Sequence, residues 1–118
     1  MAKHNETGAK GEAIAAAYLR GKGYKLLAAN WRSGRKEVDI ICANDTGLVM
    51  IEVKTRSGYG YGFPEEAVES AKMNMLRAAA AEYIELHPEF TQVRFDVISI
   101  LLKDDVAVEL LHLEDAFL

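Results

Sequence analysis

Two apolar runs on either side of a short polar turn constrain the fold most strongly, in the segment KEVDIICANDTGLVMIEVKTR, residues 36–56. Apolar runs flanking Asn44-Asp45-Thr46-Gly47 predict a β-hairpin. A turn centred on Asp45 and Thr46 places Asp39 directly opposite Glu52, whereas a glycine bulge at Gly47 would shift this register by one residue.

Side-chain alternation divides the predicted hairpin into two unlike faces. The first face carries three charged residues among apolar ones, and the second is wholly apolar and is expected to pack against a helix. The first face consists of Asp39, Ile41, Met50, Glu52 and Lys54; the second consists of Val38, Ile40, Cys42, Val49, Ile51 and Val53.

The remaining elements follow from helix and strand signals. A helix is expected over residues 7–21, with Thr7 as its N-cap, and a second helix from Pro64 to about Leu86. Further strands are expected over residues 24–31, 92–102 and 106–113. The resulting order, α-β-β-β-α-β-β, predicts an α/β fold with a mixed central sheet flanked by helices.

Length and charge narrow the class of protein. The 118 residues suit a single domain, with its core over about 8–113, and no apolar stretch is long enough to cross a membrane, so a cytoplasmic protein is expected. The single cysteine, Cys42, is expected to be buried and reduced.

The net charge is −4, but residues 20–56 hold eight Lys/Arg against four Asp/Glu. A polyanion can therefore be expected to dock on this half, although the same charges could simply be solvated.

Charged residues also lie on the apolar stripes of both predicted helices. Glu12 shares a face with Ala15, Ala16 and Leu19, and Lys72 shares one with Met75 and Ala79. Burying such charges unpaired would cost several kcal/mol. Two interpretations stay open at this point: a structural ion-pair network or charged sheet edge, and a Mg²⁺ site built from carboxylates with a lysine beside it.

The order of these residues resembles a known superfamily. Asp39, a turn, and then Glu52-Val53-Lys54 at the end of the next strand resemble the PD-(D/E)XK nucleases, whose restriction-endonuclease-like core has the same order of elements. Within that superfamily the chain resembles the YraN family, small bacterial proteins related to Holliday-junction resolvases. The blocks that carry this resemblance are GEAIAAAYLRGKGYKLLAANWR, EVDII, LVMIEVKTR, FPEEAV…K and RFDVISI.

The resemblance implies a role for each residue of the charged set. Asp39 and Glu52 would bind a Mg²⁺ or Mn²⁺ ion, together with the backbone carbonyl of Val53. Glu12 would complete the acidic cluster, Lys54 would orient the attacking water, and Lys72 would approach the phosphate or the cluster. Lys36 departs from the family pattern, in which glycine is expected before EVD.

Residues around this set are candidates for binding nucleic acid. They are Arg32, Arg35, Lys36, Arg56, Tyr59 and Tyr61. The tyrosines alternate with glycine in a loop whose composition suits stacking on bases. Trp31 is expected to anchor the core rather than to contact phosphate.

Two hypotheses about function follow. The first is a divalent-metal-dependent endonuclease-like protein acting on DNA phosphodiesters, in particular on branched or structured DNA. The second is a non-catalytic module that keeps the nuclease fold and binds nucleic acid or a partner. A homodimer would suit the first hypothesis, because two symmetric sites match a branched substrate.

Overall fold

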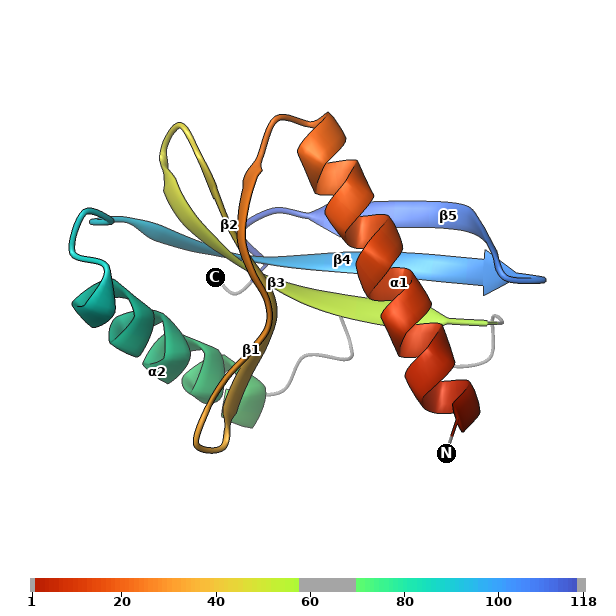
Figure 1. Cartoon of the computed structure of the whole chain (residues 1–118), viewed down its shortest axis with the longest axis horizontal. Coiled ribbons are helices and arrows are strands. Elements are labelled where there is room, and N and C mark those ends of the chain that lie inside the picture. The colour runs from red at the N-terminus through yellow and green to blue at the C-terminus, as the bar shows by residue number, and fades with distance from the viewer. Residues whose placement is uncertain (1, 58–69, 117–118) are drawn as a thin grey trace.

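A five-stranded mixed sheet with one helix on each face makes up the part of the chain that the computed structural model describes, residues 2–57 and 70–116. The predicted order of elements is confirmed. The elements are α1 (Ala2–Gly21), β1 (Lys25–Ser33), β2 (Lys36–Asn44), β3 (Gly47–Arg56), α2 (Ser70–Leu86), β4 (Val93–Lys103) and β5 (Val106–Leu113) (Figure 1).

The strands lie side by side in chain order, β1-β2-β3-β4-β5. Neighbouring strands are antiparallel except β3 and β4, which are parallel. The connection between this parallel pair carries α2, as parallel strands require a crossover. The two central strands therefore bring their carboxyl ends to the same end of the sheet.

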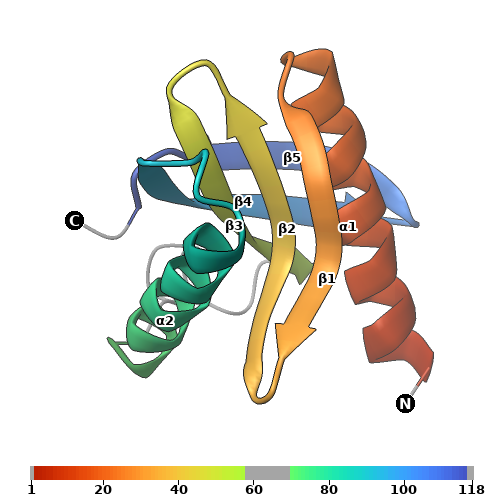
Figure 2. The same ribbon diagram turned by 60° about the vertical axis from the view of Figure 1, so that its left-hand side comes forward.

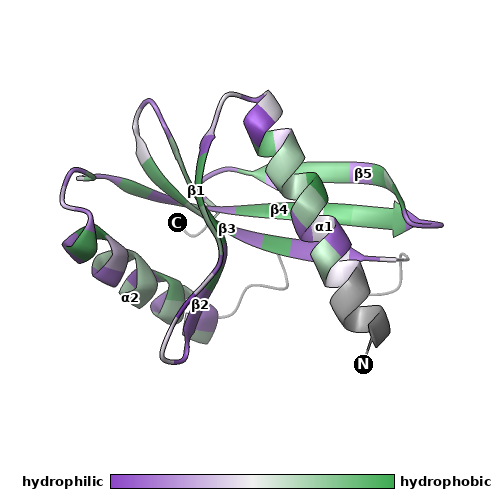
Figure 3. Cartoon of the chain, viewed as in Figure 1, coloured by the Kyte–Doolittle hydropathy of each residue, from purple (hydrophilic) through white to green (hydrophobic). Residues whose placement is uncertain are grey.

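Each face of the sheet has its own apolar cluster, one against each helix (Figures 1 and 2). Because side chains alternate along β3, those of Leu48 and Met50 lie on the α2 face of the sheet. Those of Val49 and Ile51 lie on the α1 face. Figure 3 shows apolar residues along most of β4 and hydrophilic residues at the turn between β4 and β5. A buried Leu or Ile contributes about 1.5–3 kcal/mol, so these two layers supply most of the stabilisation.

The predicted hairpin register is confirmed over five pairs, from Ile40 with Ile51 to Asn44 with Gly47. The Asn44 side-chain Oδ1 closes the turn by accepting hydrogen bonds from the backbone N–H of Thr46 at 2.9 Å and of Gly47 at 3.1 Å. Cys42 is a buried free thiol whose pKa burial raises to about 12, as its place on the apolar face predicts.

One residue on the hairpin, Val38, faces the opposite way from the prediction. It packs in the α2-side cluster with Ile41, although strict alternation would group it with Ile40. The partner strand shows the same break, since Ala28 and Trp31, three residues apart, both pack against that cluster. The backbone between them contains Asn30 with φ of 52°, a left-handed conformation that interrupts the alternation.

The two helices begin at other residues than predicted within the described part of the chain. Thr7 is not an N-cap, because α1 begins at Ala2 and runs through Thr7 without interruption by Pro. The predicted start of the second helix at Pro64 lies outside the described residues, within which α2 begins at Ser70. No helix in the described residues is long and apolar enough to cross a membrane.

A buried polar cluster ties β4 and β5 to α1. Asp96 is 0% exposed and accepts two hydrogen bonds from Arg94, at 2.8 and 2.7 Å, and one from the Asp115 N–H at 3.0 Å. His112 Nε2 lies 2.8 Å from Asp96, and His112 Nδ1 lies 2.9 Å from the Tyr18 hydroxyl. Burial opposes ionisation of Asp96, but these bonds outweigh it and lower its pKa. The Arg94–Asp96 ion pair is therefore structural.

Helix α1 approaches β3 closely at Gly11. A β-carbon at this position would lie 2.8 Å from Thr55 Cβ, whereas one at Gly8 would meet no atom within 4 Å. Both glycines lie inside α1, where glycine is about 1 kcal/mol less favourable than alanine. Glycine at position 11 therefore allows the close packing that brings Glu12, the next residue, to the end of the sheet.

The two glycines should respond oppositely to the same substitution. We expect Gly8→Ala to raise the free energy of unfolding by about 0.5–1 kcal/mol through helix propensity. We expect Gly11→Ala to lower it by about 1–3 kcal/mol, because the methyl group has to displace Thr55. Urea titration followed by circular dichroism measures both, and an unchanged or raised stability in Gly11→Ala would contradict the close approach.

Candidate functional site

Five charged side chains from four elements meet near the carboxyl end of β3. Asp39 comes from β2, Glu52 and Lys54 from β3, Lys72 from α2 and Glu12 from α1. Alternation places Glu52 and Lys54 on the α2 side of the sheet with Met50. The site therefore lies where α2 passes beside the β2 and β3 strands (Figure 2).

Glu52 is the most deeply buried member, with 6% of its surface exposed. Its Oε2 lies 3.4 Å from Lys54 Nζ and 3.2 Å from Lys72 Nζ. A buried carboxylate without a partner would cost several kcal/mol, so both ammonium groups are needed where they lie. The ion pairs expected from a structural network are therefore present, with Lys72 paired to Glu52 rather than to Asp39.

Asp39 lies just beyond the last ladder pair of β2 and β3, Ile40 with Ile51. Its Oδ2 accepts a hydrogen bond from the Val53 N–H at 2.8 Å. The side chain thus satisfies a backbone donor at the point where the described pairing of the two strands stops. The structure brings Val53 to Asp39 through its N–H, whereas the resemblance implied a role for its carbonyl.

The environment of Asp39 disfavours its charge. Burial raises its pKa from 3.8 to about 6, and the Glu52 carboxylate adds to this. The Val53 hydrogen bond and Lys72 oppose the shift, and Glu12 supports it. A carboxyl group held in this way gains most from a cation beside it.

Glu12 reaches the same group of acids from α1. Burial raises its pKa, and Glu52 and Glu37 raise it further. The Asn30 side chain lowers it. Glu52 raises the pKa of both Glu12 and Asp39, so the three carboxylates repel one another, and together with Lys54 and Lys72 the fully ionised set carries a net charge of −1.

The donor set fits a hard divalent cation. Mg²⁺ and Mn²⁺ bind carboxylate oxygens and keep several waters, so two acids such as Asp39 and Glu52 suffice. Among residues 2–57 and 70–116, no three His, Cys, Asp or Glu side chains lie close enough together to hold a metal ion. Asp39 and Glu52 are the two acids that the resemblance implies would hold such an ion.

The predicted basic turn is engaged in contacts with acids. Arg32 pairs with Glu37 at 3.4 Å, and Lys36 pairs with Glu82 of α2 at 3.1 Å. The Ser33 hydroxyl also donates to Glu82, and these contacts, the Ser33 bond first, lower the pKa of Glu82. They fasten the β1–β2 turn to α2.

The other residues predicted to bind nucleic acid lie at separate places in the chain. Arg35 is exposed at the tip of the turn, and Arg56 ends β3 two residues beyond Lys54. Trp31 packs against the α2-side cluster with its ring edge-on to Tyr83, 6.2 Å between centroids, as a core residue should. Tyr59 and Tyr61 lie outside the described residues.

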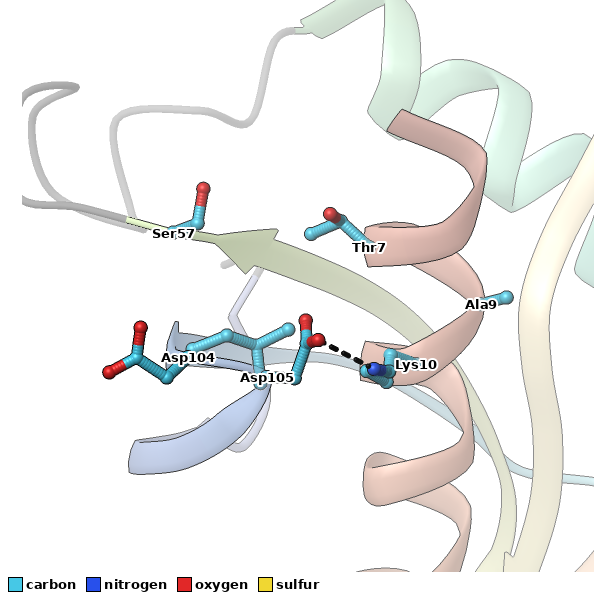
Figure 4. Close-up of a pocket in the computed structure, with 7 residues that line it drawn as sticks. Thr7, Ala9, Lys10, Ser57, Asp104 and Asp105 are labelled. Carbon is cyan, nitrogen blue, oxygen red and sulfur yellow. Dashed lines mark ion pairs between the residues drawn. The ribbon is translucent and has the colours of Figure 1, made fainter. Parts of the chain in front are cut away.

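A cavity of about 870 Å³ opens elsewhere, between α1 and the β4–β5 turn. Thr7, Lys10, Ser57, Asp104 and Asp105 line it, and a 3.2 Å ion pair joins Lys10 to Asp105 (Figure 4). None of the five clustered charges takes part in its lining. Its two aspartates also disfavour phosphate, so we do not assign it to the same site.

Sequence reasoning missed three residues that shape these surroundings. They are Asn30, Glu82 and His112, none of which is among the predicted site residues. Their partners are distant in sequence, so strand and helix periodicity contains no signal for them. The left-handed conformation of Asn30 had one sequence cue, because asparagine tolerates it better than most residues.

The fold and the site together define a mixed α/β protein with a carboxylate–lysine cluster at the end of its parallel strand pair. Residues 11–100 match the model of the uncharacterised protein family UPF0102. A UPF0102 protein of Porphyromonas gingivalis is 42% identical over 118 residues, covering 99% of this chain and 87% of that protein. A UPF0102 protein of Rhodococcus opacus is also 42% identical over 118 residues, with 99% and 100% covered. The chain belongs to the UPF0102 family, which is the YraN family that its sequence blocks resemble.

The raised pKa of Asp39 predicts how stability depends on pH. The folded chain holds this proton up to about pH 6, whereas the unfolded chain releases it near 3.8. The contribution of Asp39 to the free energy of unfolding therefore falls as the pH rises from about 4 to 6. We expect Asp39→Asn, in the presence of a chelator, to be more stable than the wild type by about 2 kcal/mol at pH 7.5 and by less at pH 4.5.

Urea unfolding at the two pH values measures this difference. Asp45→Asn, in the exposed β2–β3 turn, is the matched control and should show no such pH dependence. A loss of several kcal/mol in Asp39→Asn at pH 7.5 would instead show that Asp39 is a stabilising member of an ion-pair network.

Proposed function

We propose that this protein is a divalent-metal-dependent nuclease that cleaves DNA phosphodiesters, with branched or structured DNA as its substrate class. The observation that carries the proposal is the pairing of Glu52 with Lys54 and Lys72 at the end of β3, with the Asp39 and Glu12 carboxylates near enough to Glu52 for their pKa values to be raised by it. A structural network would balance its charges, but this cluster keeps one carboxylate in excess. Asp39 in particular keeps a raised pKa although Lys72 and the Val53 N–H both favour its charged form.

The proposed roles follow from position. Asp39 and Glu52 would hold a Mg²⁺ or Mn²⁺ ion, which when bound supplies positive charge to the phosphate and acidifies a water. Lys54, 3.4 Å from Glu52, would hold the attacking water by hydrogen bonding. Lys72, from α2, would neutralise charge on a phosphoryl oxygen as it develops. Glu12 would accept a hydrogen bond from a water at the cluster.

The surrounding charge supports a polyanionic substrate. The segment from residue 20 to 56, which forms β1 to β3, has a surplus of four positive charges. Lys36 contacts Glu82, ten residues along α2 from Lys72, so the basic turn lies about 15 Å from the cluster along the helix. A duplex spans this distance in about four base pairs, so one DNA strand could contact both places.

The second candidate is a module that binds nucleic acid or a partner without cleaving it. The ion pairs of Lys54 and Lys72 with Glu52 favour it, because they satisfy the most buried carboxylate in the absence of a metal. Under this proposal the same basic turn would bind DNA, and the cluster would only stabilise the sheet.

Cleavage and metal binding separate the two proposals. We expect Mn²⁺ to bind the wild type, to raise its melting temperature, and to support cleavage of a branched DNA. Glu52→Gln, with nearly the same shape and no charge, should lose metal binding and reduce cleavage by at least about a hundredfold. Calorimetry, thermal melting and gel assays on linear, flapped and four-way DNA give the three readouts.

Glu85→Gln, an exposed position on α2, is the control and should match the wild type in all three assays. Equal cleavage by the wild type and Glu52→Gln would show that the cluster is not the active site. DNA binding with neither metal binding nor cleavage would establish the binding module.

The basic turn yields a separate prediction. We expect Arg35→Gln to weaken DNA binding and to reduce the slope of log affinity against log salt by about 0.9, because one phosphate contact is lost. Lys103→Gln removes the same charge at the β4–β5 turn and should leave the slope unchanged. Fluorescence anisotropy over a salt series measures both, and identical slopes for the two variants would exclude the turn from the DNA interface.

A further inference from the structure

The two edges of the sheet differ in the side chains that they expose. Four large apolar side chains are exposed in the described part of the chain, and three of them belong to β5: Val106 at 61%, Val108 at 53% and Leu111 at 44%. The opposite edge strand, β1, instead exposes polar residues such as Lys25 and Arg32. Charged side chains keep an edge strand from pairing with further strands, whereas an apolar edge strand favours such pairing.

The backbone of β5 is available along its outer side. β5 is the last strand of the sheet and pairs with β4 (Figure 1). Residues 109–113 pair with residues 101 to 97 in an uninterrupted antiparallel register. Outside this ladder, no backbone hydrogen bond joins residues 106–113 to another part of the described chain. Alternate N–H and C=O groups of the stretch therefore point away from the sheet, and an extended segment can satisfy them in series.

Exposed carboxylates lie within this strand and on both sides of it. They belong to Asp104, Asp105, Glu109, Glu114 and Asp115. Residues 103–115 hold one Lys against five Asp/Glu, a local surplus of four negative charges. The field at this edge therefore attracts a positively charged chain.

Ion pairs within the described chain leave three of these carboxylates without a cation. Lys10 pairs with Asp105 at 3.2 Å, and Arg94 pairs with Glu114 at 3.6 Å. Glu109, in the middle of β5, is among the three that form no ion pair with any described residue. The edge thus combines an apolar surface, outward backbone groups and unneutralised negative charge.

The same charges disfavour a second copy of this chain as the occupant of the edge. Two β5 strands related by a two-fold axis would run antiparallel, so the beginning of each strand would lie near the end of the other. Asp104 and Asp105 of one copy would then approach Glu114 and Asp115 of the other. Like charges placed opposite one another destabilise a strand pair.

We propose that the outer edge of β5 binds an extended segment of a partner protein, with apolar residues flanked by Lys or Arg, as a further strand of the sheet. Main-chain hydrogen bonds to the outward groups of β5 hold the segment, and its apolar side chains cover Val106, Val108 and Leu111. Its basic ends lie against the exposed carboxylates. β5 is at the opposite edge of the sheet from β1, so the segment leaves the basic β1–β2 turn uncovered.

Fluorescence anisotropy with labelled peptides tests the proposal. The probe is a peptide of alternating valine and threonine with two lysines at each end. We expect it to bind the wild type with an affinity that falls as salt is added, because salt screens exposed charges. The same peptide with glutamates for lysines should bind at least about tenfold more weakly. The basic peptide N-methylated at its central amides should also bind about tenfold more weakly, because it cannot donate the backbone hydrogen bonds.

A charge reversal on the protein places the binding at β5. We expect Glu109→Lys to weaken binding of the basic peptide by about five- to tenfold and to strengthen binding of the acidic one. Glu85→Lys makes the same charge change at an exposed position on α2 and should alter neither affinity. Melting temperatures within a few degrees of the wild type show that both variants keep the fold. Equal affinity of the wild type and Glu109→Lys for the basic peptide, or no binding by the wild type, would overturn the proposal.

Amide signals of the ¹⁵N-labelled wild type give a test that needs no variant. The basic peptide should shift the signals of residues 106–113 and leave those of residues 25–33 in place. Shifts confined to other strands would overturn the proposal, as would a dimer whose β5 amides are protected from hydrogen exchange. These measurements use neither metal nor DNA, so their outcome is independent of the proposed nuclease function.

Discussion

The burial of Glu52 beside Lys54 and Lys72 is the interaction on which the rest of the site depends. A carboxylate with 6% of its surface exposed would cost several kcal/mol without a cationic partner, and these two ammonium groups lie within 3.4 Å of the same oxygen. One lysine comes from the same strand, two residues on, and the other from α2. The pairing therefore fixes where α2 sits against the end of β3, and with it the shape of the site.

The remaining acids are placed at a cost to stability. Burial, and after it repulsion by Glu52 and Glu12, raises the pKa of Asp39 to about 6, although its hydrogen bond from the Val53 N–H opposes the shift. The Asp96 cluster shows a contrasting arrangement. There, Arg94, His112 and the Asp115 N–H surround one carboxylate and lower its pKa despite complete burial.

Much of the fold could be predicted because the strands are strongly patterned. The hairpin register followed from the turn at Asn44–Gly47, and β5 has the bounds that its apolar run indicated. The prediction failed at Val38, since period-two reasoning assumes an unbroken strand and the left-handed Asn30 breaks it. It also failed at Thr7, because a favourable capping residue does not end a helix that its flanking residues can continue.

The sequence by itself determined which residues carry charge on otherwise apolar surfaces, namely Glu12, Asp39, Glu52, Lys54 and Lys72, because periodicity assigns each residue to a face. Only the tertiary structure decided how they pair: Lys72 with Glu52, and Asp39 with the Val53 N–H. Periodicity is a property of one element, whereas these contacts join residues from different elements. Their geometry depends on how closely helix and sheet pack. At Gly11 the absence of a side chain allows this close packing, and the hydrophobic periodicity of the neighbouring residues gives no indication of it.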